Sequence, residues 1–224
     1  MNSRIPFDLY LVTDRHRTAG RPLLDVVERA LAAGTKVIQL RERDLSAHEL
    51  LSLAERLKNR TDHAGATLLI NDRVDVGLMV GAGGVHLQAD HLPIPVVRRL
   101  LGPKPLIGVS CHQMDEVIQA EKEGADFVVL GPIYDTPSKR AFGAPIGVEI
   151  LRAAKACSSI PIFAIGGIRS DRIQEVLQAG AMGVGVISGI LEAPDVEKAT
   201  RHMLEALHSH LAKPALTIDR KEFR

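Results

Sequence analysis

The sequence predicts a single (β/α)8 barrel, an α/β fold in which eight parallel strands close into a ring covered by helices. Three observations favour this fold. The chain has 224 residues, which is within the usual range for a one-domain barrel. Short apolar runs alternate with amphipathic helical patterns from one end to the other. About eight such units in this length favour a closed barrel over an open, doubly wound sheet.

Each strand is predicted from a short, near-continuous apolar run, which is typical of a parallel sheet covered by helices. The strand predictions are residues 8–13, 37–41, 67–71, 84–87, 106–110, 127–131, 162–166 and 183–187. Helical patterns lie between them, at residues 23–33, 47–58, 114–123, 148–156 and 172–179. A helix over residues 196–211 closes the domain, which we place at residues 1–212, and residues 213–224 are expected to form a mobile tail.

Small residues and glycine recur between a helix and the next strand, around Gly34, Gly81, Gly124 and Gly180. Glycine suits the position that follows the last turn of a helix, and small residues allow a helix to pack tightly on a strand. Many α/β proteins use such turns, so they support the architecture and say nothing about chemistry.

The composition restricts the partners of the protein. The formal net charge is +1, so no general attraction to nucleic acid or to a membrane surface is expected. There is no signal-peptide pattern and no apolar stretch of about 18 residues. The two cysteines, Cys111 and Cys157, are too few for a disulfide framework. We expect a cytoplasmic protein, and a homo-oligomer is compatible with these features.

In barrels of this type the functional residues lie at the carboxyl ends of the strands. Gln39, Arg41 and Arg43 stand at alternate positions at the end of the second strand and just beyond it. Alternation directs these side chains to one face, where two guanidinium groups would bind phosphate or pyrophosphate oxygens. The alternative is a solvated charge run that ends a strand.

The third and fourth strands carry candidate magnesium ligands. Asn71 and Asp72 end the third strand, where the carboxylate would bind Mg²⁺ or, alternatively, cap the next helix. Asp90 and His91 follow the fourth strand and offer a second metal contact. His86, inside that strand, is more often a hydrogen-bonded core histidine than a ligand.

The fifth and sixth strands offer groups for proton transfer and for binding. Ser110 and His112 follow the fifth strand, and His112 is a candidate general acid or base near neutral pH. Cys111 between them faces the other way, so no hydrolase triad is predicted. The long segment 131–143 after the sixth strand is expected to cover the substrate or, alternatively, to be a plain surface loop. Its candidate ligands are Thr136, Ser138 and Lys139.

Glycine-bearing turns follow the last two strands. Gly166 and Gly167 come after the seventh strand, and Ile187, Ser188 and Gly189 come after the eighth. In (β/α)8 barrels these two turns are a frequent place for a phosphate group held by backbone N–H groups.

These motifs together resemble the thiamin-phosphate synthase/TenI family over nearly the whole chain. The resemblance rests on residues 10–14 (YLVTD), 39–43 (QLRER), 71–73 (NDR), 84–87 (GVHL), 108–112 (GVSCH), 131–139 (GPIYDTPSK), 165–168 (IGGI) and 186–188 (VIS).

The resemblance implies that the protein joins hydroxymethylpyrimidine pyrophosphate to a thiazole phosphate, with release of pyrophosphate. It implies that Gln39, Arg41, Asn71, Ser110 and Lys139 contact the pyrimidine pyrophosphate and that Asp72 binds Mg²⁺. It assigns the thiazole phosphate to residues 136–138, Gly167, Ile187 and Ser188.

Two departures from the family pattern keep alternatives open. Arg43 stands where the synthase pattern has lysine, and His91 stands where it has a second metal-binding aspartate, with Asp90 one residue early. These favour the sister activity, a metal-free thiazole tautomerase with His112 as the acid–base group, whereas the Asn71–Asp72 pair favours the synthase. A third alternative is a non-catalytic sensor of a phosphorylated ligand. Aldolase-like barrels are less favoured because no strand holds an interior lysine.

Overall fold

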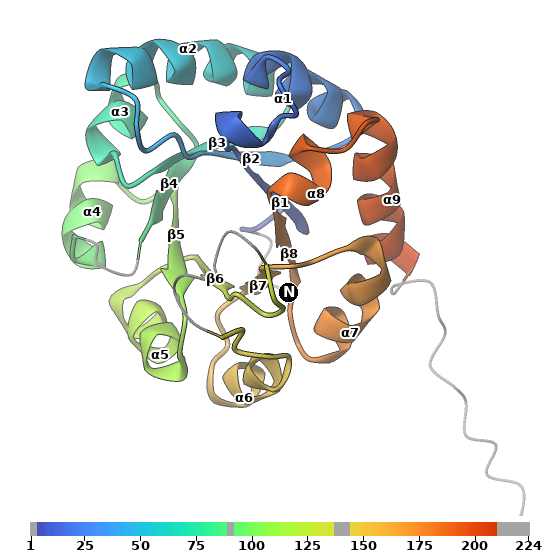
Figure 1. Ribbon diagram of the computed structural model, residues 1–224. Helices are drawn as coiled ribbons and strands as arrows, with labels where there is room; N and C mark the ends of the chain where they lie inside the picture. Colours follow the sequence, from blue (N-terminus) through green and yellow to red (C-terminus); the bar gives the residue numbers. More distant parts are fainter. Residues whose placement is uncertain (1–3, 89–91, 137–143, 210–224) are drawn as a thin grey trace, which may run out of the picture.

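A computed structural model of the chain describes residues 4–88, 92–136 and 144–209. Eight strands pair in chain order, each parallel to the next, and β8 returns to β1, which closes the barrel (Figure 1). The predicted fold class is therefore confirmed. The strands are β1 (Leu9–Val12), β2 (Val37–Leu40), β3 (Thr67–Asn71), β4 (Gly84–Leu87), β5 (Leu106–Cys111), β6 (Phe127–Leu130), β7 (Ile162–Ile165) and β8 (Gly183–Val186).

Helices surround the barrel on its outer side (Figure 1). They are α1 (Leu23–Ala32), α2 (Ala47–His63), α3 (Val74–Met79), α4 (Ile94–Leu101), α5 (Met114–Glu123), α6 (Glu149–Cys157), α7 (Ile173–Gln178), α8 (Ser188–Leu191) and α9 (Val196–Ser209), with short 3-10 turns η1 (Arg15–Arg17) and η3 (Ser170–Arg172). The α2 helix is five residues longer than predicted, and its last turn buries Thr61 and pairs Lys58 with Asp62 at 2.5 Å.

Successive side chains along each strand point to opposite faces of the barrel wall, so the protein has an outer core and an inner core. Side chains such as Ile38 and Leu40 point outward and pack against the helices. Inward side chains fill the barrel, and the members of this inner cluster are Phe7, Tyr10, Val12, Val37, Leu69, Leu106, Phe127, Val129 and Phe163. Four aromatic rings of the inner cluster stack with centroids 5.3–6.0 Å apart, so the barrel interior is a packed core and not a channel.

Above this apolar layer the barrel interior becomes polar. His86 is 2% exposed, and its Nδ1 lies 3.0 Å from the Tyr10 hydroxyl while its Nε2 lies 2.9 Å from the Ser110 hydroxyl. Burial, followed by the charge of Arg41, lowers the pKa of His86 to about 3, so the ring is neutral. His86 is thus a hydrogen-bonded core histidine, as the sequence indicated.

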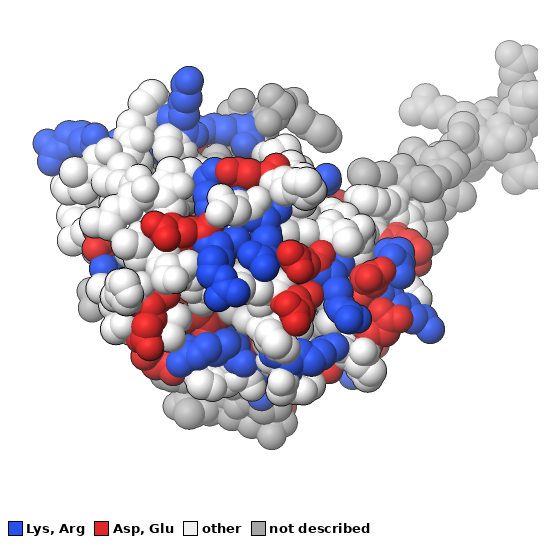
Figure 2. All heavy atoms as spheres, turned by 90° about the horizontal axis from the view of Figure 1, so that it is seen from above, with Lys and Arg blue, Asp and Glu red and all other residues white. Residues whose placement is uncertain are grey.

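The outer surface mixes charges of both signs. On the side of the barrel that lies at the top of Figure 1, acidic and basic side chains are interspersed (Figure 2), in agreement with the small net charge. Among the described residues, no helix is long and apolar enough to cross a membrane. Gly34, Gly81, Gly124 and Gly180 all have positive φ, which confirms the predicted helix ends.

Candidate active site

Amide side chains tie together the carboxyl ends of β2, β3 and β4. The Gln39 Nε2 donates to Asn71 Oδ1 at 3.0 Å, and Gln88 Nε2 donates to the same oxygen at 2.8 Å. The Asn71 Nδ2 donates to Asp72 Oδ2 at 3.0 Å. Gln39 and Asn71 are buried, so the structure brings two of the predicted substrate ligands together at the top of the barrel interior.

Asp72 is held in place by its backbone and its side chain. Its φ is +55°, in the left-handed region, and its N–H donates to His86 O at 2.9 Å. Its Oδ1 accepts from the Gln88 N–H at 2.8 Å. The interpretation of Asp72 as a helix cap is wrong, because Arg73 occupies that position before α3 and no side chain caps the helix. The Asp72 carboxylate is therefore held by Asn71 at the end of β3 and by Gln88 just after β4.

The two arginines after β2 lie close together. Arg41 is half-buried, and its N–H donates to Thr13 Oγ1 at 2.9 Å. Burial and then the neighbouring charge of Arg43 lower the pKa of Arg41, against the opposite effect of Asp14, Asp72 and Glu42. Both arginines lie beyond β2, which ends at Leu40, and Arg43 is exposed. Within the described part of the chain, neither guanidinium has an ion pair or a side-chain hydrogen bond.

The side chains at the end of β5 are hydrogen-bonded, buried or exposed in turn. The Ser110 hydroxyl is engaged with His86, and Cys111 is buried against the helices, where burial raises its pKa to about 12. His112 is exposed, and its Nδ1 lies 2.5 Å from Gly131 O. These positions agree with the prediction that Cys111 is a packing residue, and they place His112 at the edge of the mouth.

The segment after β6 packs directly on the glycine turn after β7. The Tyr134 N–H donates to Gly166 O at 3.0 Å, and a Cβ added to Gly167 would lie 2.7 Å from Asp135 O. Gly167 has a φ of +65°, so both its conformation and its surroundings require glycine. The turn thus lies beside the segment that carries Thr136.

Arg172 holds this turn and was not singled out from the sequence. Its Nη1 donates to Gly167 O at 2.7 Å, and its guanidinium lies 4.4 Å from the centroid of the Tyr134 ring. The Tyr134 hydroxyl donates to Glu175 Oε2 at 2.5 Å. Arg172 begins a predicted helix, where an arginine is ordinary, and only the fold brings it against Gly167.

The turn after β8 leads at once into α8, whose first residue is Ser188. The Ile187 carbonyl accepts from the N–H groups of Ile190 at 3.2 Å and Leu191 at 2.9 Å. The first N–H groups of a helix have no acceptor within it, and those of Ser188 and Gly189 have none among the described residues. The turns after β7 and β8 lie on adjacent strands at the same end of the barrel as Asn71 and Asp72.

Four predicted site residues, Ser138, Lys139, Asp90 and His91, lie outside the described residues, and so does the boundary at 212. Within the described ranges, no group of three or more His, Cys, Asp or Glu side chains forms a metal site. Of the three predicted metal ligands, the structure therefore places Asp72 alone.

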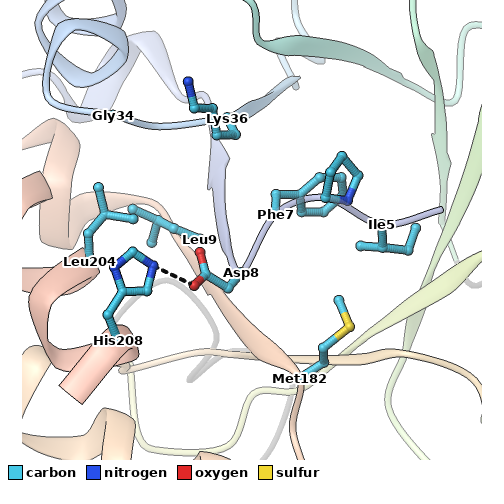
Figure 3. A pocket seen from close by; sticks show the side chains of 10 residues that line it. Ile5, Phe7, Asp8, Leu9, Gly34, Lys36, Met182, Leu204 and His208 are labelled. Carbon is cyan, nitrogen blue, oxygen red and sulfur yellow. Dashed lines mark ion pairs between the residues drawn. The ribbon is translucent and has the colours of Figure 1, made fainter. Parts of the chain in front are cut away.

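A cavity of about 500 Å³ lies at the other end of the barrel (Figure 3). Its wall comes from the amino ends of β1 and β8 and from α9, and it is mostly apolar. The polar groups there are Lys36 and an ion pair between Asp8 and His208 at 3.0 Å. Because the amide, arginine and glycine groups gather at the carboxyl ends, this cavity is not the candidate active site.

The fold and the arrangement of these groups define a (β/α)8 barrel of the phosphate-binding class, with cationic and carboxylate groups after β2 and β3 and glycine turns after β7 and β8. A family model described as "Thiamine monophosphate synthase" matches residues 9–190. The chain belongs to the thiamine monophosphate synthase family.

Similar proteins agree with this assignment. A protein of Geobacter sulfurreducens named "Putative thiamine-phosphate synthase" is 50% identical, with 92% of this chain and 96% of that protein covered. The "Thiamine-phosphate synthase" of Moorella thermoacetica is 47% identical, with 90% and 96% covered. The solved structure of a "Thiamine phosphate pyrophosphorylase from Pyrococcus furiosus" has a TM-score of 0.84 and 35% identity, with 94% of this chain and 100% of that chain covered.

Proposed function

We propose that the protein is a thiamin-phosphate synthase, a transferase that joins hydroxymethylpyrimidine pyrophosphate to hydroxyethylthiazole phosphate and releases pyrophosphate. The observation that carries the proposal is one barrel mouth with two kinds of anion site. Arg41 lies near both Arg43 and the fixed Asp72 carboxylate, and neither arginine has an ion-pair partner among the described residues. Glycine turns follow β7 and β8 at the same end of the barrel. Family membership supports the same reaction.

The chemistry requires the pyrophosphate to leave from the pyrimidine methylene carbon. The C–O bond breaks with its electron pair going to the pyrophosphate, and the resulting pyrimidine cation is captured by the thiazole nitrogen. In this proposal Arg41, Arg43 and Lys139 stabilise the charge that develops on the leaving group. Gln39 and Asn71 orient the pyrimidine ring, and Ser110 contacts the same substrate.

The thiazole substrate is positioned by its phosphate. In this proposal the N–H groups of Gly167 and Ser188 bind the phosphate oxygens, with Thr136, Ser138 and Ile187 completing the contact. Holding the nitrogen opposite the reacting carbon replaces a bimolecular encounter by a positioned one, which is a large part of what this active site must supply. His112, at the edge of the mouth, is the candidate for any proton transfer.

The site fits a magnesium cofactor. Each oxygen of the Asp72 carboxylate accepts one hydrogen bond and keeps a lone pair for a metal. Mg²⁺ commonly binds one or two carboxylates, substrate phosphates and water, so one described carboxylate suffices when pyrophosphate is present. Bound there, Mg²⁺ would neutralise pyrophosphate oxygens. Asp90 and His91 stay predicted ligands, and a cytoplasmic location and a homo-oligomer also stay predictions.

The proposal is tested by supplying the purified protein with both substrates and Mg²⁺ and by measuring thiamin phosphate and pyrophosphate. Equal amounts of both products support the synthase, and no turnover with Mg²⁺ or Mn²⁺ contradicts it. NMR of the thiazole carboxylate phosphate tests the tautomerase, whose rate should depend on His112. Tight ligand binding without either reaction would instead indicate a sensor.

A further inference from the structure

A buried carboxylate lies between the two arginines in the sequence. Glu42 is 5% exposed, and it is the one buried Asp, Glu, Lys or Arg residue in the described part of the chain. Asp44, two residues further on, is exposed. Acidic and basic side chains thus alternate from residue 41 to residue 44, and without another partner the two acids would neutralise the arginines beside them.

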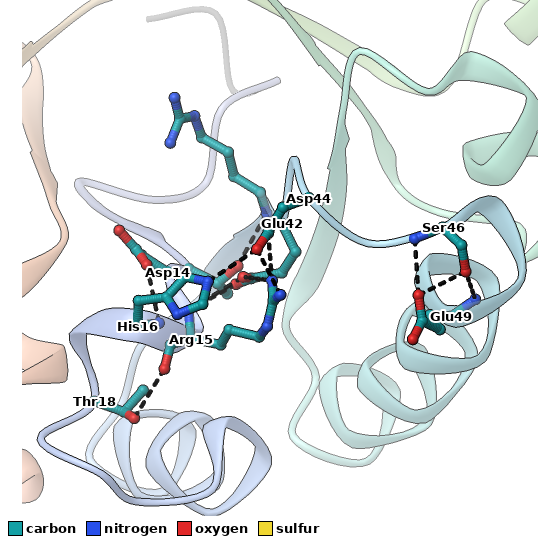
Figure 4. Close-up of polar contacts among 10 residues, drawn as sticks. Asp14, Arg15, His16, Thr18, Glu42, Asp44, Ser46 and Glu49 are labelled. Carbon is teal, nitrogen blue, oxygen red and sulfur yellow. Dashed lines mark hydrogen bonds and ion pairs between the residues drawn. The ribbon is translucent and has the colours of Figure 1, made fainter.

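The two acids have another partner, Arg15 of η1 (Figure 4). The Arg15 N–H donates to both Glu42 oxygens at 3.1 Å, and its Nη1 donates to Glu42 Oε2 at 3.2 Å. The same guanidinium donates to the two Asp44 oxygens, from Nη1 at 2.5 Å and from Nη2 at 2.6 Å. This two-point contact is the strongest arrangement that an arginine makes with a carboxylate.

His16 adds a further contact to Asp44, with Nε2 lying 3.0 Å from Oδ2. The loop after β1 and the loop after β2 are therefore joined by one cation that binds both acids. Arg41 and Arg43, on the same loop, have no ion pair among the described residues, although Arg41 is half-buried. Burial and the charge of Arg43 outweigh the carboxylates of Asp14, Asp72 and Glu42 and lower the pKa of Arg41, so an anion bound there would be favourable.

We propose that Arg15 is a positioning residue that withdraws Glu42 and Asp44 from Arg41 and Arg43, and so keeps a pyrophosphate site cationic. The inference rests on the proposed function for the identity of the anion. In this proposal Arg15 affects pyrophosphate binding through charge and not only through the stability of the loop. Without the Arg15 guanidinium, the two acids would turn to the two arginines and compete with pyrophosphate.

The test measures the binding of inorganic pyrophosphate with Mg²⁺ by isothermal titration calorimetry. Arg15→Gln removes the guanidinium, so Asp44 is freed from Arg15 and Glu42 keeps only the Arg15 main-chain N–H as a partner. Pyrophosphate binding is expected to weaken by about tenfold, because each carboxylate can then pair weakly with an arginine. Adding Glu42→Gln and Asp44→Asn to Arg15→Gln removes the competing charges and should restore binding to within about threefold of the unmodified protein. Arg17→Gln is the matched control, because Arg17 lies on the same turn but pairs with Glu192 at 2.8 Å, and it should change nothing.

If Arg15→Gln does not fold, Asp44→Asn alone serves as the test variant. It should fold, because the Asp44 side chain is 55% exposed. It should leave pyrophosphate binding unchanged or slightly tighter. Weaker binding in Asp44→Asn, unchanged binding in Arg15→Gln, or a triple variant as weak as the single one would overturn the inference. Synthase turnover of the unmodified protein is scored separately, so a failed inference and a failed proposed function are distinguished.

Discussion

Substituting Gly167 by alanine tests whether the glycine turn after β7 is built for a ligand. An alanine Cβ would lie 2.7 Å from Asp135 O and 2.9 Å from Tyr134 Cβ, distances that real Cβ atoms essentially never show. The positive φ of +65° adds its own penalty. The segment after β6 or the turn itself must therefore move.

The expected loss of unfolding free energy in Gly167→Ala has two contributions. A left-handed alanine costs about 1–2 kcal/mol relative to glycine, and the forced displacement adds about 1–3 kcal/mol, as in other overpacked sites. Gly65→Ala is the matched control, because Gly65 has a φ of +60° and an added Cβ there has nothing within 4 Å. The control should lose about 1–2 kcal/mol of unfolding free energy, and Gly167→Ala about 2–5 kcal/mol.

The functional effect should be confined to one substrate. A shift of a few tenths of an ångström in the phosphate-binding turn is expected to raise the KM for the thiazole phosphate by about tenfold or more, while the KM for the pyrimidine pyrophosphate changes little. Urea unfolding and steady-state kinetics on Gly167→Ala and Gly65→Ala measure both effects. An unchanged thiazole KM in Gly167→Ala would refute the assignment of this turn.

Three further predictions concern other parts of the mouth. Asp72→Asn keeps a residue that tolerates positive φ but removes the charge, so turnover should fall by about 100-fold and need more Mg²⁺, with little change in urea unfolding. Arg172→Gln removes the support of Gly167 and should raise the thiazole KM by about tenfold at constant pyrimidine KM. Burial lowers the pKa of His86 from 6.5 to about 3, so the unfolded state binds the extra proton and the unfolding free energy falls as pH decreases from 6.5 towards 3. His86→Gln should flatten that part of the pH profile, which urea unfolding at several pH values would show.

The fold could be predicted from the sequence because the period of the apolar residues and the spacing of the apolar runs indicate alternating strands and helices. Alternation correctly placed Gln39 inside the barrel, and the apolar context of His86 correctly predicted a core histidine. The order of the strands, once a barrel is assumed, puts Asn71, Gly167 and Ser188 at one end.

Contacts between distant loops were not predictable in the same way. Arg15 and Arg172 are ordinary residues in their local sequence, and only the closure of the barrel brings the first to Glu42 and the second to Gly167. Gln88 is a similar case, since its side chain, just after β4, contacts Asn71 at the end of the neighbouring strand β3. The position of Arg43 stays a prediction, because a strand period holds only while the strand continues and β2 ends at Leu40.

A crystal structure with thiamin phosphate, pyrophosphate and Mg²⁺ would test the account most directly. We expect the phosphate group of thiamin phosphate to lie against the N–H groups of Gly167 and Ser188, and the pyrophosphate to lie against Arg41 and Arg43. Mg²⁺ should lie about 2.0–2.1 Å from an Asp72 oxygen. Phosphate groups bound at the amino-end cavity, or a mouth in which Arg41 and Asp72 touch no ligand, would contradict it.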